Sequence, residues 1–417
     1  MNATISCSGV YGEISAIASK SLAHRLLIAS AFSDKKTTIR CESLNDDIIA
    51  TADCLRAIGA DINYENSYFT VEPASKNNSG ILPCNESGTT MRMLLPVVCA
   101  IGGSWHFLMK GRLPERPLSP LKEELESHGI KFEYVAKDDL LVSGKLQSGS
   151  YTIRADVSSQ FVSGLLFALS LLDKESTLTL TGNIESAPYI ELTLNVLNFL
   201  GANITRKDNV FTIPASKLYA HEESFVEGDW SNAAFPLCAA ALGGSVTLKN
   251  IDPCSTQGDK KIIEILKRFG AEVFTQDNSV SVKKAELNGI EINAEDIPDL
   301  VPVLAVVAAG ANGTTRISGA SRLRIKESDR IQTTYEMLSN LGADIELLND
   351  GFLIHGKNKL CGGTISSYND HRIAMSAAVA SAICENEVTI LNANATNKSY
   401  PTFWQEIEKL GFNVKLN

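Results

Sequence analysis

A repeated pattern of apolar and polar positions runs through the whole chain. Each copy contains a segment whose apolar residues are spaced as on one face of a helix, followed by a glycine and a β-rich run. The six glycines lie 69 to 72 residues apart, so six periods account for all 417 residues. A fixed period indicates one supersecondary unit used repeatedly, each copy burying its apolar face against its neighbours. The glycines are Gly59, Gly129, Gly201, Gly270, Gly342 and Gly411.

The period between residues 229 and 284 shows the expected elements most clearly. Its pattern predicts a small-residue helix over 231–242, a strand over 245–248 and a longer amphipathic helix over 257–269. Two short strands follow the closing Gly270. A glycine directly after a helix is typical of a position that needs a left-handed backbone. With a strand leading into each first helix, the predicted unit is βαβαββ.

The periodicity alone leaves two questions open. The second period is the least clear, because the polar stretch 137–150 fits either a strand or a loop. A regular repeat is also typical of a solenoid or ring without any chemistry.

Composition and charge narrow the class of protein. A chain of 417 residues with 44% apolar content can bury a large core and favours two domains. The formal charge of −10 and the pI near 5.3 argue against nucleic acid or an anionic membrane as the main partner. Apolar runs such as 161–172 and 300–311 fall short of the roughly 20 residues of a membrane span. The first residues do not resemble a signal peptide, so we expect a cytoplasmic protein.

The cysteines and histidines predict no metal or disulfide framework. The nine cysteines form no C-x-x-C pair and are odd in number, which favours buried, reduced thiols. The six histidines show no spacing typical of metal ligands.

Polar and cationic residues recur near the predicted helix starts. Six polar residues stand 38 to 43 positions before the glycines, and three cations stand 12 or 13 positions before them. A helix N-terminus presents unpaired N–H groups and about half a positive charge, so it favours anions. The polar residues are Ser21, Thr89, Ser159, Ser231, Asp299 and His371, and the three cations are Arg116, Arg330 and Lys398.

Cations at helix starts oppose the helix dipole unless an anion is bound. At an effective dielectric constant of about 20, two like charges 4 Å apart repel by roughly 4 kcal/mol. The five cations concerned therefore predict a ligand with several negative charges, of the kind that arginine forks bind. Each cation could instead pair with a nearby acid, as Arg116 with Glu115. The five are Lys20, Arg116, Arg330, Arg372 and Lys398.

Seven short motifs, spread from the first repeat to the sixth, carry a family resemblance. Together they resemble, in order, the signature of the 5-enolpyruvylshikimate-3-phosphate synthases, and KESDR with NDHR is the most specific part. The motifs are SKSLAHR at 19–25, SGTTMR at 87–92, ERP at 115–117, DVSSQ at 156–160, KESDR at 326–330, NDHR at 369–372 and NKS at 397–399.

The resemblance implies an α/β fold of the two-lobed enolpyruvyl transferase type, an inside-out α/β barrel. Each lobe would contain three βαβαββ repeats, which agrees with the sixfold period. The first lobe would comprise residues 1–18 and 229–417, and the second lobe residues 19–228. The active site would lie in the cleft between them.

The family's reaction transfers the enolpyruvyl group of phosphoenolpyruvate to the 5-hydroxyl of shikimate 3-phosphate and releases phosphate, in the shikimate pathway. The resemblance implies no cofactor, no metal and no partner besides these two substrates, and we expect a monomer. Asp299 would accept the hydroxyl proton, and Glu327 with Lys20 would handle the proton at the methylene carbon.

The resemblance also implies which residues bind the two substrates. The implied ligands of shikimate 3-phosphate are Lys20, Ser21, Arg25, Ser158, Ser159, Gln160, Ser186, Asp299 and Lys326. The implied ligands of phosphoenolpyruvate are Lys20, Gly88, Arg116, Gln160, Arg330, Arg372 and Lys398.

Some positions depart from the family pattern, and two other functions compete. Glu86 and Arg322 stand where the family often has asparagine, and Ala187 and Met93 replace a frequent lysine and proline.

The related enzyme that enolpyruvylates UDP-N-acetylglucosamine commonly carries a reactive cysteine in the loop equivalent to 104–118, which has none here. A non-catalytic repeat protein that binds an acidic partner is the second alternative.

Overall fold

The chain forms two compact units. The computed structural model describes residues 1–75 and 77–417. Unit 1 comprises Met1–Ile17 and Glu227–Asn417, and unit 2 comprises Ala18–Val226. Unit 1 therefore contains both ends of the chain, and its limits differ by one and two residues from the lobe limits expected from the motifs.

Unit 2 holds repeats one to three. Its elements, in chain order, are α1 (Lys20–Ala31), β3 (Thr37–Arg40), α2 (Asp46–Ile58), β4 (Asp61–Glu65), β5 (Tyr68–Glu72), β6 (Ser79–Asn85), α3 (Gly88–Ile101), β7 (Gly103–Met109), η1 (Leu113–Glu115), α4 (Leu121–Ser127), β8 (Lys131–Ala136), β9 (Asp139–Gly144), β10 (Ser150–Arg154), α5 (Ser159–Leu169), β11 (Ser176–Thr181), α6 (Ala187–Phe199), β12 (Thr205–Lys207), β13 (Val210–Ile213) and β14 (Glu223–Phe225).

Unit 1 holds repeats four to six and the first two strands of the chain. Its elements are β1 (Ala3–Cys7), β2 (Val10–Ser15), α7 (Trp230–Gly243), β15 (Gly244–Lys249), η2 (Gly258–Lys261), α8 (Ile262–Phe269), β16 (Glu272–Gln276), β17 (Ser279–Lys283), β18 (Glu291–Asn293), η3 (Pro298–Leu300), α9 (Val301–Ala309), β19 (Thr314–Ser318), η4 (Ser321–Ile325), α10 (Arg330–Asn340), β20 (Asp344–Leu348), β21 (Gly351–His355), β22 (Gly363–Ser366), α11 (His371–Ala380), η5 (Ser381–Ile383), β23 (Val388–Leu391), η6 (Ala393–Lys398), α12 (Phe403–Lys409) and β24 (Phe412–Leu416).

The predicted βαβαββ unit is confirmed in the sheets. Among the described residues, each unit has three four-stranded sheets. In repeat two, β6 and β7 are parallel on either side of α3, and β9 pairs antiparallel with both β7 and β8. The polar stretch that fitted either a strand or a loop thus contains strand β9.

Three sheets include a strand from a distant part of the chain. Strand β2 pairs parallel with β15 in repeat four, and β14 pairs parallel with β3 in repeat one. Strand β1 lies between β23 and β24 and pairs antiparallel with both. Strand β2 precedes α1 of unit 2 in the sequence but belongs to a sheet of unit 1, and β14 precedes α7 of unit 1 but belongs to a sheet of unit 2. The periodicity did not predict this exchange.

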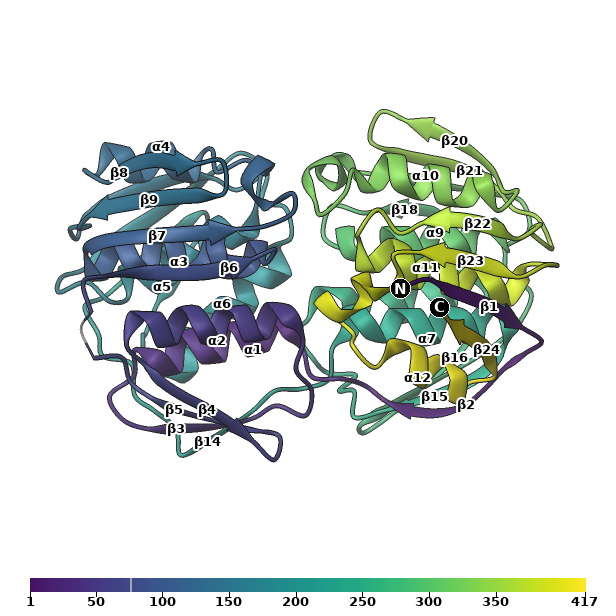
Figure 1. Ribbon diagram of the computed structural model, residues 1–417, viewed down its shortest axis with the longest axis horizontal. Helices are drawn as coiled ribbons and strands as arrows, with labels where there is room; N and C mark the ends of the chain where they lie inside the picture. Colours follow the sequence, from purple (N-terminus) through teal and green to yellow (C-terminus); the bar gives the residue numbers. More distant parts are fainter. Residues whose placement is uncertain (76) are drawn as a thin grey trace. The chain divides into compact units, whose positions relative to one another are not determined.

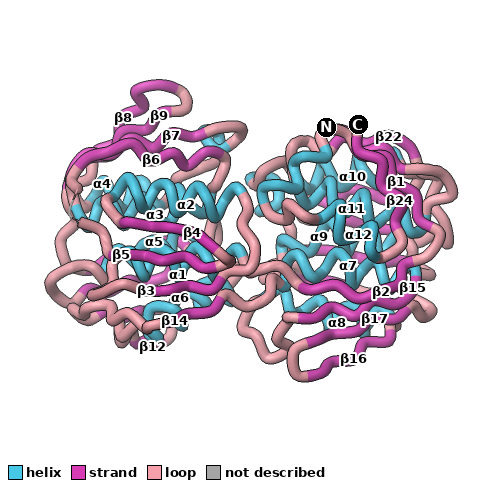
Figure 2. Tube along the Cα trace, turned by 60° about the horizontal axis from the view of Figure 1, so that its bottom comes forward, coloured by secondary structure: helices cyan, strands magenta, loops and turns pink. Residues whose placement is uncertain are grey.

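The first helix of each repeat lies in the core of its unit. In α9 all nine residues are buried, whereas the second helix α8 buries only Ile262, Ile265, Leu266 and Phe269. A helix that is apolar on all sides is stable only when protein surrounds it. Helix α3 contacts both α1 and α5 in unit 2, and α7, α9 and α11 contact one another in unit 1. The sheets form the outer layer of each unit (Figures 1 and 2).

The repeat glycines have the predicted backbone conformation. All six have φ values between 86° and 113°, the left-handed region that disfavours a side chain. Space is also limiting, because a Cβ on Gly59 would lie 2.4 Å from the carbonyl oxygen of Ser75. A Cβ on Gly270 would lie 2.5 Å from the carbonyl oxygen of Glu286.

Candidate active site

Unit 1 contains a buried arginine bound by three carboxylates. Arg330 is the first residue of α10 and is 1% exposed. Its guanidinium nitrogens lie 2.7 Å from Asp299 Oδ1, 2.7 Å from Glu327 Oε2 and 2.8 Å from Asp370 Oδ2. Asp370 caps the N-terminus of α11 and is fully buried. The charge of Arg330 is therefore compensated within the unit, as a buried ion requires.

Three cations lie within ion-pair distance of the Asp299 carboxylate. It lies in η3, directly before α9, and its side chain is 21% exposed. Its oxygens lie 2.7 Å from Arg330 Nη1, 3.3 Å from Arg372 Nη2 and 3.7 Å from Lys326 Nζ. Burial alone would raise the pKa of Asp299, but Arg372, Lys326 and Arg330 outweigh it and hold this pKa well below its usual range. The carboxylate is therefore ionised at neutral pH.

The surroundings also determine the pKa of Lys326 and the position of Lys398. Burial lowers the pKa of the Lys326 ammonium to about 8. Lys398 Nζ donates a hydrogen bond to the carbonyl oxygen of Asn369, at 2.6 Å, so the lysine is fixed beside the turn that precedes Arg372.

Asp259 is a functional candidate that sequence reasoning missed. It lies in η2, is 1% exposed and accepts a hydrogen bond from the hydroxyl of Ser231. Burial and the charge of Asp299 raise the pKa of Asp259 to about 6. Asp259 lies in the polar first turn of the helix predicted over 257–269, where a single acid gives no signal of burial.

Unit 2 contains a buried arginine without a carboxylate partner. Arg25 is 2% exposed and donates to Thr193 Oγ1 at 2.8 Å, to the Tyr189 carbonyl at 2.9 Å and to the Ser21 carbonyl at 2.6 Å. No carboxylate of residues 1–75 and 77–417 forms an ion pair with it. Burial lowers the pKa of Arg25 to about 10, which reflects this lack of compensation. A buried positive charge with only neutral acceptors favours an anionic ligand.

A second group in unit 2 joins the starts of α3 and α5. The Arg116 guanidinium packs directly on Gly88, since a Cβ on Gly88 would lie 2.5 Å from Arg116 Nη1. Gln160 Nε2 donates to Thr89 Oγ1 at 2.8 Å, and Arg92 Nη1 donates to Gln160 Oε1 at 3.2 Å. Glycine at 88 therefore makes room for the guanidinium.

The remaining predicted residues of unit 2 lie at other helix starts. Lys20 is the first residue of α1 and forms an ion pair with Asp47 of α2 at 2.8 Å. Ser158 caps α5, of which Ser159 is the first residue. Ser186 precedes α6 with a left-handed φ of 55° and is 3% exposed.

The predicted helix starts at Arg116 and Lys398 are wrong. Arg116 follows the short turn η1, and α4 begins only at Leu121. Lys398 is the last residue of η6, and α12 begins at Phe403. Prolines 117, 120 and 401 explain the delay, because a proline disfavours helical backbone in the residue before it.

Glu115, the acid considered as a partner of Arg116, forms its ion pair with Lys137 instead. Glu115 Oε1 accepts from Lys137 Nζ at 3.0 Å. Of the four departures from the family pattern, Arg322 donates to the carbonyl of Glu295 at 3.0 Å, and the Glu86 carboxylate lies against Gly111.

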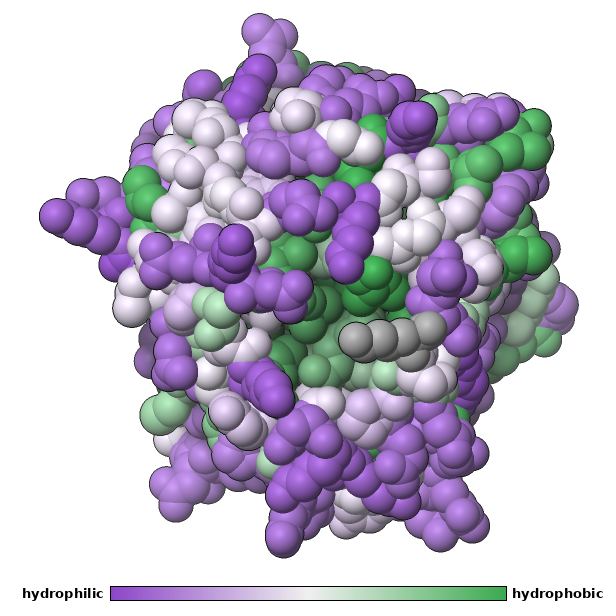
Figure 3. Space-filling view, turned by 90° about the vertical axis from the view of Figure 1, so that its left-hand side faces the viewer, coloured by the Kyte–Doolittle hydropathy of each residue, from purple (hydrophilic) through white to green (hydrophobic). Residues whose placement is uncertain are grey.

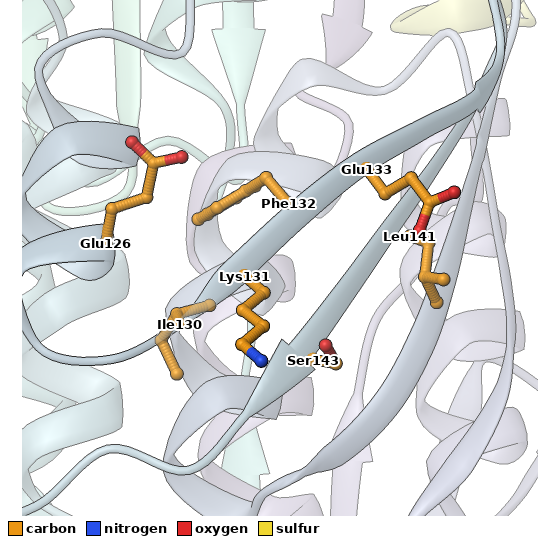
Figure 4. A pocket seen from close by; sticks show the side chains of 7 residues that line it. All are labelled: Glu126, Ile130, Lys131, Phe132, Glu133, Leu141 and Ser143. Carbon is orange, nitrogen blue, oxygen red and sulfur yellow. The ribbon is translucent and has the colours of Figure 1, made fainter.

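One cavity of the described residues contains none of the predicted site residues. A cavity of about 600 Å³ lies between α4 and strands β8 and β9, lined by residues such as Glu126 and Lys131 (Figure 4). The face of unit 2 in Figure 3 is mostly hydrophilic, with apolar groups gathered in a central hollow.

Within the described part of the chain, no three His, Cys, Asp or Glu side chains could share a metal ion. No helix there has the length and apolarity to span a bilayer.

The cysteines are only partly as predicted. All nine are free thiols, and Cys41, Cys54, Cys84, Cys99 and Cys238 are buried. Cys254 and Cys361 are exposed, so the expectation of burial fails for these two.

Comparison with solved structures defines the class. The enolpyruvyl transferase NikO from Streptomyces tendae aligns with a TM-score of 0.76 and 18% identity, over 99% of this chain and 98% of that one. This likeness places the fold among the enolpyruvyl transferases. The EPSP synthase structure from Acinetobacter baumannii aligns with a TM-score of 0.83 and 26% identity, over 100% of both chains.

Sequence comparison defines the family. The EPSP synthase (3-phosphoshikimate 1-carboxyvinyltransferase) family model matches residues 6–407. A 3-phosphoshikimate 1-carboxyvinyltransferase of Clostridium perfringens is 39% identical over 417 residues, covering 99% of this chain and 98% of the relative. Another from Brachyspira hyodysenteriae is 38% identical over 420 residues, covering 99% and 100%. The chain therefore belongs to the EPSP synthase family, and the predicted family, fold and enzyme class are confirmed.

Proposed function

We propose that the two clusters act on one pair of substrates, so that the chain carries out the reaction of its family with residues of both units. That reaction joins the enolpyruvyl group of phosphoenolpyruvate to the 5-hydroxyl of shikimate 3-phosphate and releases phosphate. The observation that carries the proposal is Arg25, a buried cation that, among the described residues, is hydrogen-bonded only to neutral acceptors. Shikimate 3-phosphate, with a carboxylate and a phosphate, supplies the missing negative charge.

The ligands of shikimate 3-phosphate come mainly from unit 2. Arg25 donates to the carbonyls of Ser21 and Tyr189 in the first turns of α1 and α6, and the starts of α1, α5 and α6 carry hydroxyl and amide groups that offer donors to an anion. Unit 1 adds Lys326 and Asp299. The full assigned set is Lys20, Ser21, Arg25, Ser158, Ser159, Gln160, Ser186, Asp299 and Lys326.

Phosphoenolpyruvate has three negatively charged oxygens to compensate, and the assigned ligands are mostly cations. Arginine forks match carboxylate and phosphate oxygens, and the open backbone at Gly88 lets Arg116 approach. The assigned set is Lys20, Gly88, Arg116, Gln160, Arg330, Arg372 and Lys398. Bound anions would replace part of the carboxylate contacts that now hold Arg330 and Arg372.

The proton transfers are assigned to three residues. The 5-hydroxyl oxygen bonds to C2 of phosphoenolpyruvate while its proton passes to Asp299. The methylene carbon takes a proton from the carboxylic acid form of Glu327, assisted by Lys20. The C2–O bond to phosphate then breaks and the departing phosphate takes the proton held by Asp299, while a methyl proton returns to Glu327 and the double bond is restored. Each general acid–base step of this kind is worth about 10²–10⁴-fold in rate.

The charges around Asp299 make its basicity depend on substrate. In the unliganded unit, Arg372, Lys326 and Arg330 hold its pKa too low for an efficient base at neutral pH. When substrate anions neutralise these cations, the pKa of Asp299 rises and the carboxylate can accept the hydroxyl proton. Binding would thereby activate the base.

The test is a phosphate-release assay with phosphoenolpyruvate and either shikimate 3-phosphate or UDP-N-acetylglucosamine. We expect release only with shikimate 3-phosphate, from a cytoplasmic, monomeric enzyme that needs no added metal. Release with UDP-N-acetylglucosamine alone, or with neither acceptor, would contradict the proposal.

A further inference from the structure

Two successive residues before α11 have left-handed backbone. Tyr368 has a φ of 53° and Asn369 a φ of 56°. Bulky side chains are rarely found in this region, because their Cβ crowds the neighbouring carbonyl. Such conformations persist where the surrounding contacts impose them, and they cluster at functional sites.

Hydrogen bonds on one side tie this turn to η6, the element that carries Lys398. Ser367 is fully buried; its N–H donates to the Leu391 carbonyl at 3.1 Å, and its hydroxyl donates to the Asn392 carbonyl at 2.9 Å. Asn392 directly precedes η6. The left-handed backbone also presents the Asn369 carbonyl to Lys398 Nζ, at 2.6 Å.

A side-chain contact on the other side ties the turn to α10, which begins with Arg330. The Tyr368 hydroxyl donates to Glu336 Oε2, and Glu336 Oε1 accepts from Gln332 Nε2 at 2.8 Å. The hydrogen bond to Glu336 raises the pKa of Tyr368 to about 12, so the phenol keeps its proton and remains a donor at neutral pH. The turn thus connects three elements, and each bears one assigned phosphoenolpyruvate cation.

We propose that Tyr368 and Glu336 are positioning residues for phosphoenolpyruvate. Their contact fixes the spacing of Arg330 at the start of α10, Arg372 at the start of α11 and Lys398 at the end of η6. The inference rests on the proposed function, which assigns these three cations to that substrate. Neither Tyr368 nor Glu336 belongs to the assigned ligands, so they act through the cations.

The test compares Tyr368→Phe with Tyr11→Phe, a matched loss of a phenolic hydroxyl. Tyr11 is 66% exposed on β2 of the same unit, and its hydroxyl forms no hydrogen bond within the described residues. We expect Tyr368→Phe to raise the KM for phosphoenolpyruvate roughly three- to tenfold, because one charge-assisted hydrogen bond is lost. The kcat, the Kd for shikimate 3-phosphate and the Tm should stay at the values of Tyr11→Phe.

A double-mutant cycle tests whether the two residues act together. Glu336→Ala should raise the same KM, and Tyr368→Phe combined with Glu336→Ala should be no worse than the stronger single variant. Additive effects of the two substitutions would contradict a shared contact.

Lys398→Met separates failure of this inference from failure of the proposed function. If Lys398→Met raises the KM for phosphoenolpyruvate but Tyr368→Phe matches Tyr11→Phe, the positioning role is wrong. If Lys398→Met leaves that KM unchanged, the assignment of the cations is wrong. A rise in both substrate constants with a lower Tm for Tyr368→Phe would indicate general destabilisation and overturn the inference.

Discussion

Two buried arginines with opposite surroundings give the sharpest prediction. Arg25 and Arg330 are 2% and 1% exposed, but within the described part of the chain Arg330 contacts three carboxylates and Arg25 only neutral acceptors. Removing one partner of a buried ion pair costs about 3–5 kcal/mol, because the remaining charges are left uncompensated. We therefore expect Arg330→Met to lower the free energy of unfolding of the unliganded protein by about 3–5 kcal/mol.

The effect of Arg25→Met on the unliganded protein should be much smaller. Loss of its hydrogen bonds leaves neutral acceptors without a donor, at a cost of about 1–3 kcal/mol. Removal of an uncompensated buried charge offsets that cost, so we expect a net change of about 1 kcal/mol or less in either direction. The same substitution should weaken shikimate 3-phosphate binding by about 10²-fold, since charge-assisted hydrogen bonds contribute about 1.5–3 kcal/mol each.

Both effects can be measured on the same samples. Denaturant titration of the unliganded variants gives the stability, and calorimetric titration with shikimate 3-phosphate gives the affinity. Arg56→Met is a suitable control, because Arg56 pairs with Asp53 on the surface of unit 2 with both side chains more than 40% exposed. If Arg25→Met destabilised the unliganded protein as much as Arg330→Met, the reasoning about compensation would be refuted.

Three further predictions concern catalysis and binding. Asp299→Ala should still bind both substrates, with shikimate 3-phosphate weakened by the loss of one of its ligands, while phosphate release falls at least about 10²-fold; near-normal turnover would show that another group is the base. Gly88→Ala places a Cβ 2.5 Å from Arg116 Nη1 and should raise the KM for phosphoenolpyruvate about tenfold in steady-state assays; an unchanged KM would mean that Arg116 is not a ligand. Because burial lowers the pKa of Lys326 to about 8, shikimate 3-phosphate affinity should fall as pH rises through 8, and Lys326→Met should flatten this dependence in calorimetric titrations.

The local patterns that predicted the fold correctly are those with a local physical cause. The glycine after each long helix reports a left-handed backbone, which the φ of 113° at Gly270 illustrates. The apolar run 300–311, too short to span a membrane, contains α9, in which every residue is buried because an all-apolar helix needs cover on every face.

The features that could not be predicted depend on partners that are distant in sequence. Nothing in the pattern of β2 or β14 distinguishes pairing with the nearest repeat from pairing with one about 200 residues away. The same holds for the site: Asp259 became a candidate only because η2 brings it beside Ser231. Helix starts counted back from the glycines failed at Arg116 and Lys398, where prolines delay the helix.

A crystal structure of the enzyme with shikimate 3-phosphate bound tests most directly the proposal that residues of both units bind one substrate. The account predicts that one ligand molecule accepts hydrogen bonds, at about 3 Å, from Arg25 of unit 2 and from Lys326 of unit 1. A ligand bound by residues of one unit only, with neither a direct nor a single-water-mediated hydrogen bond to the cation of the other unit, would contradict it.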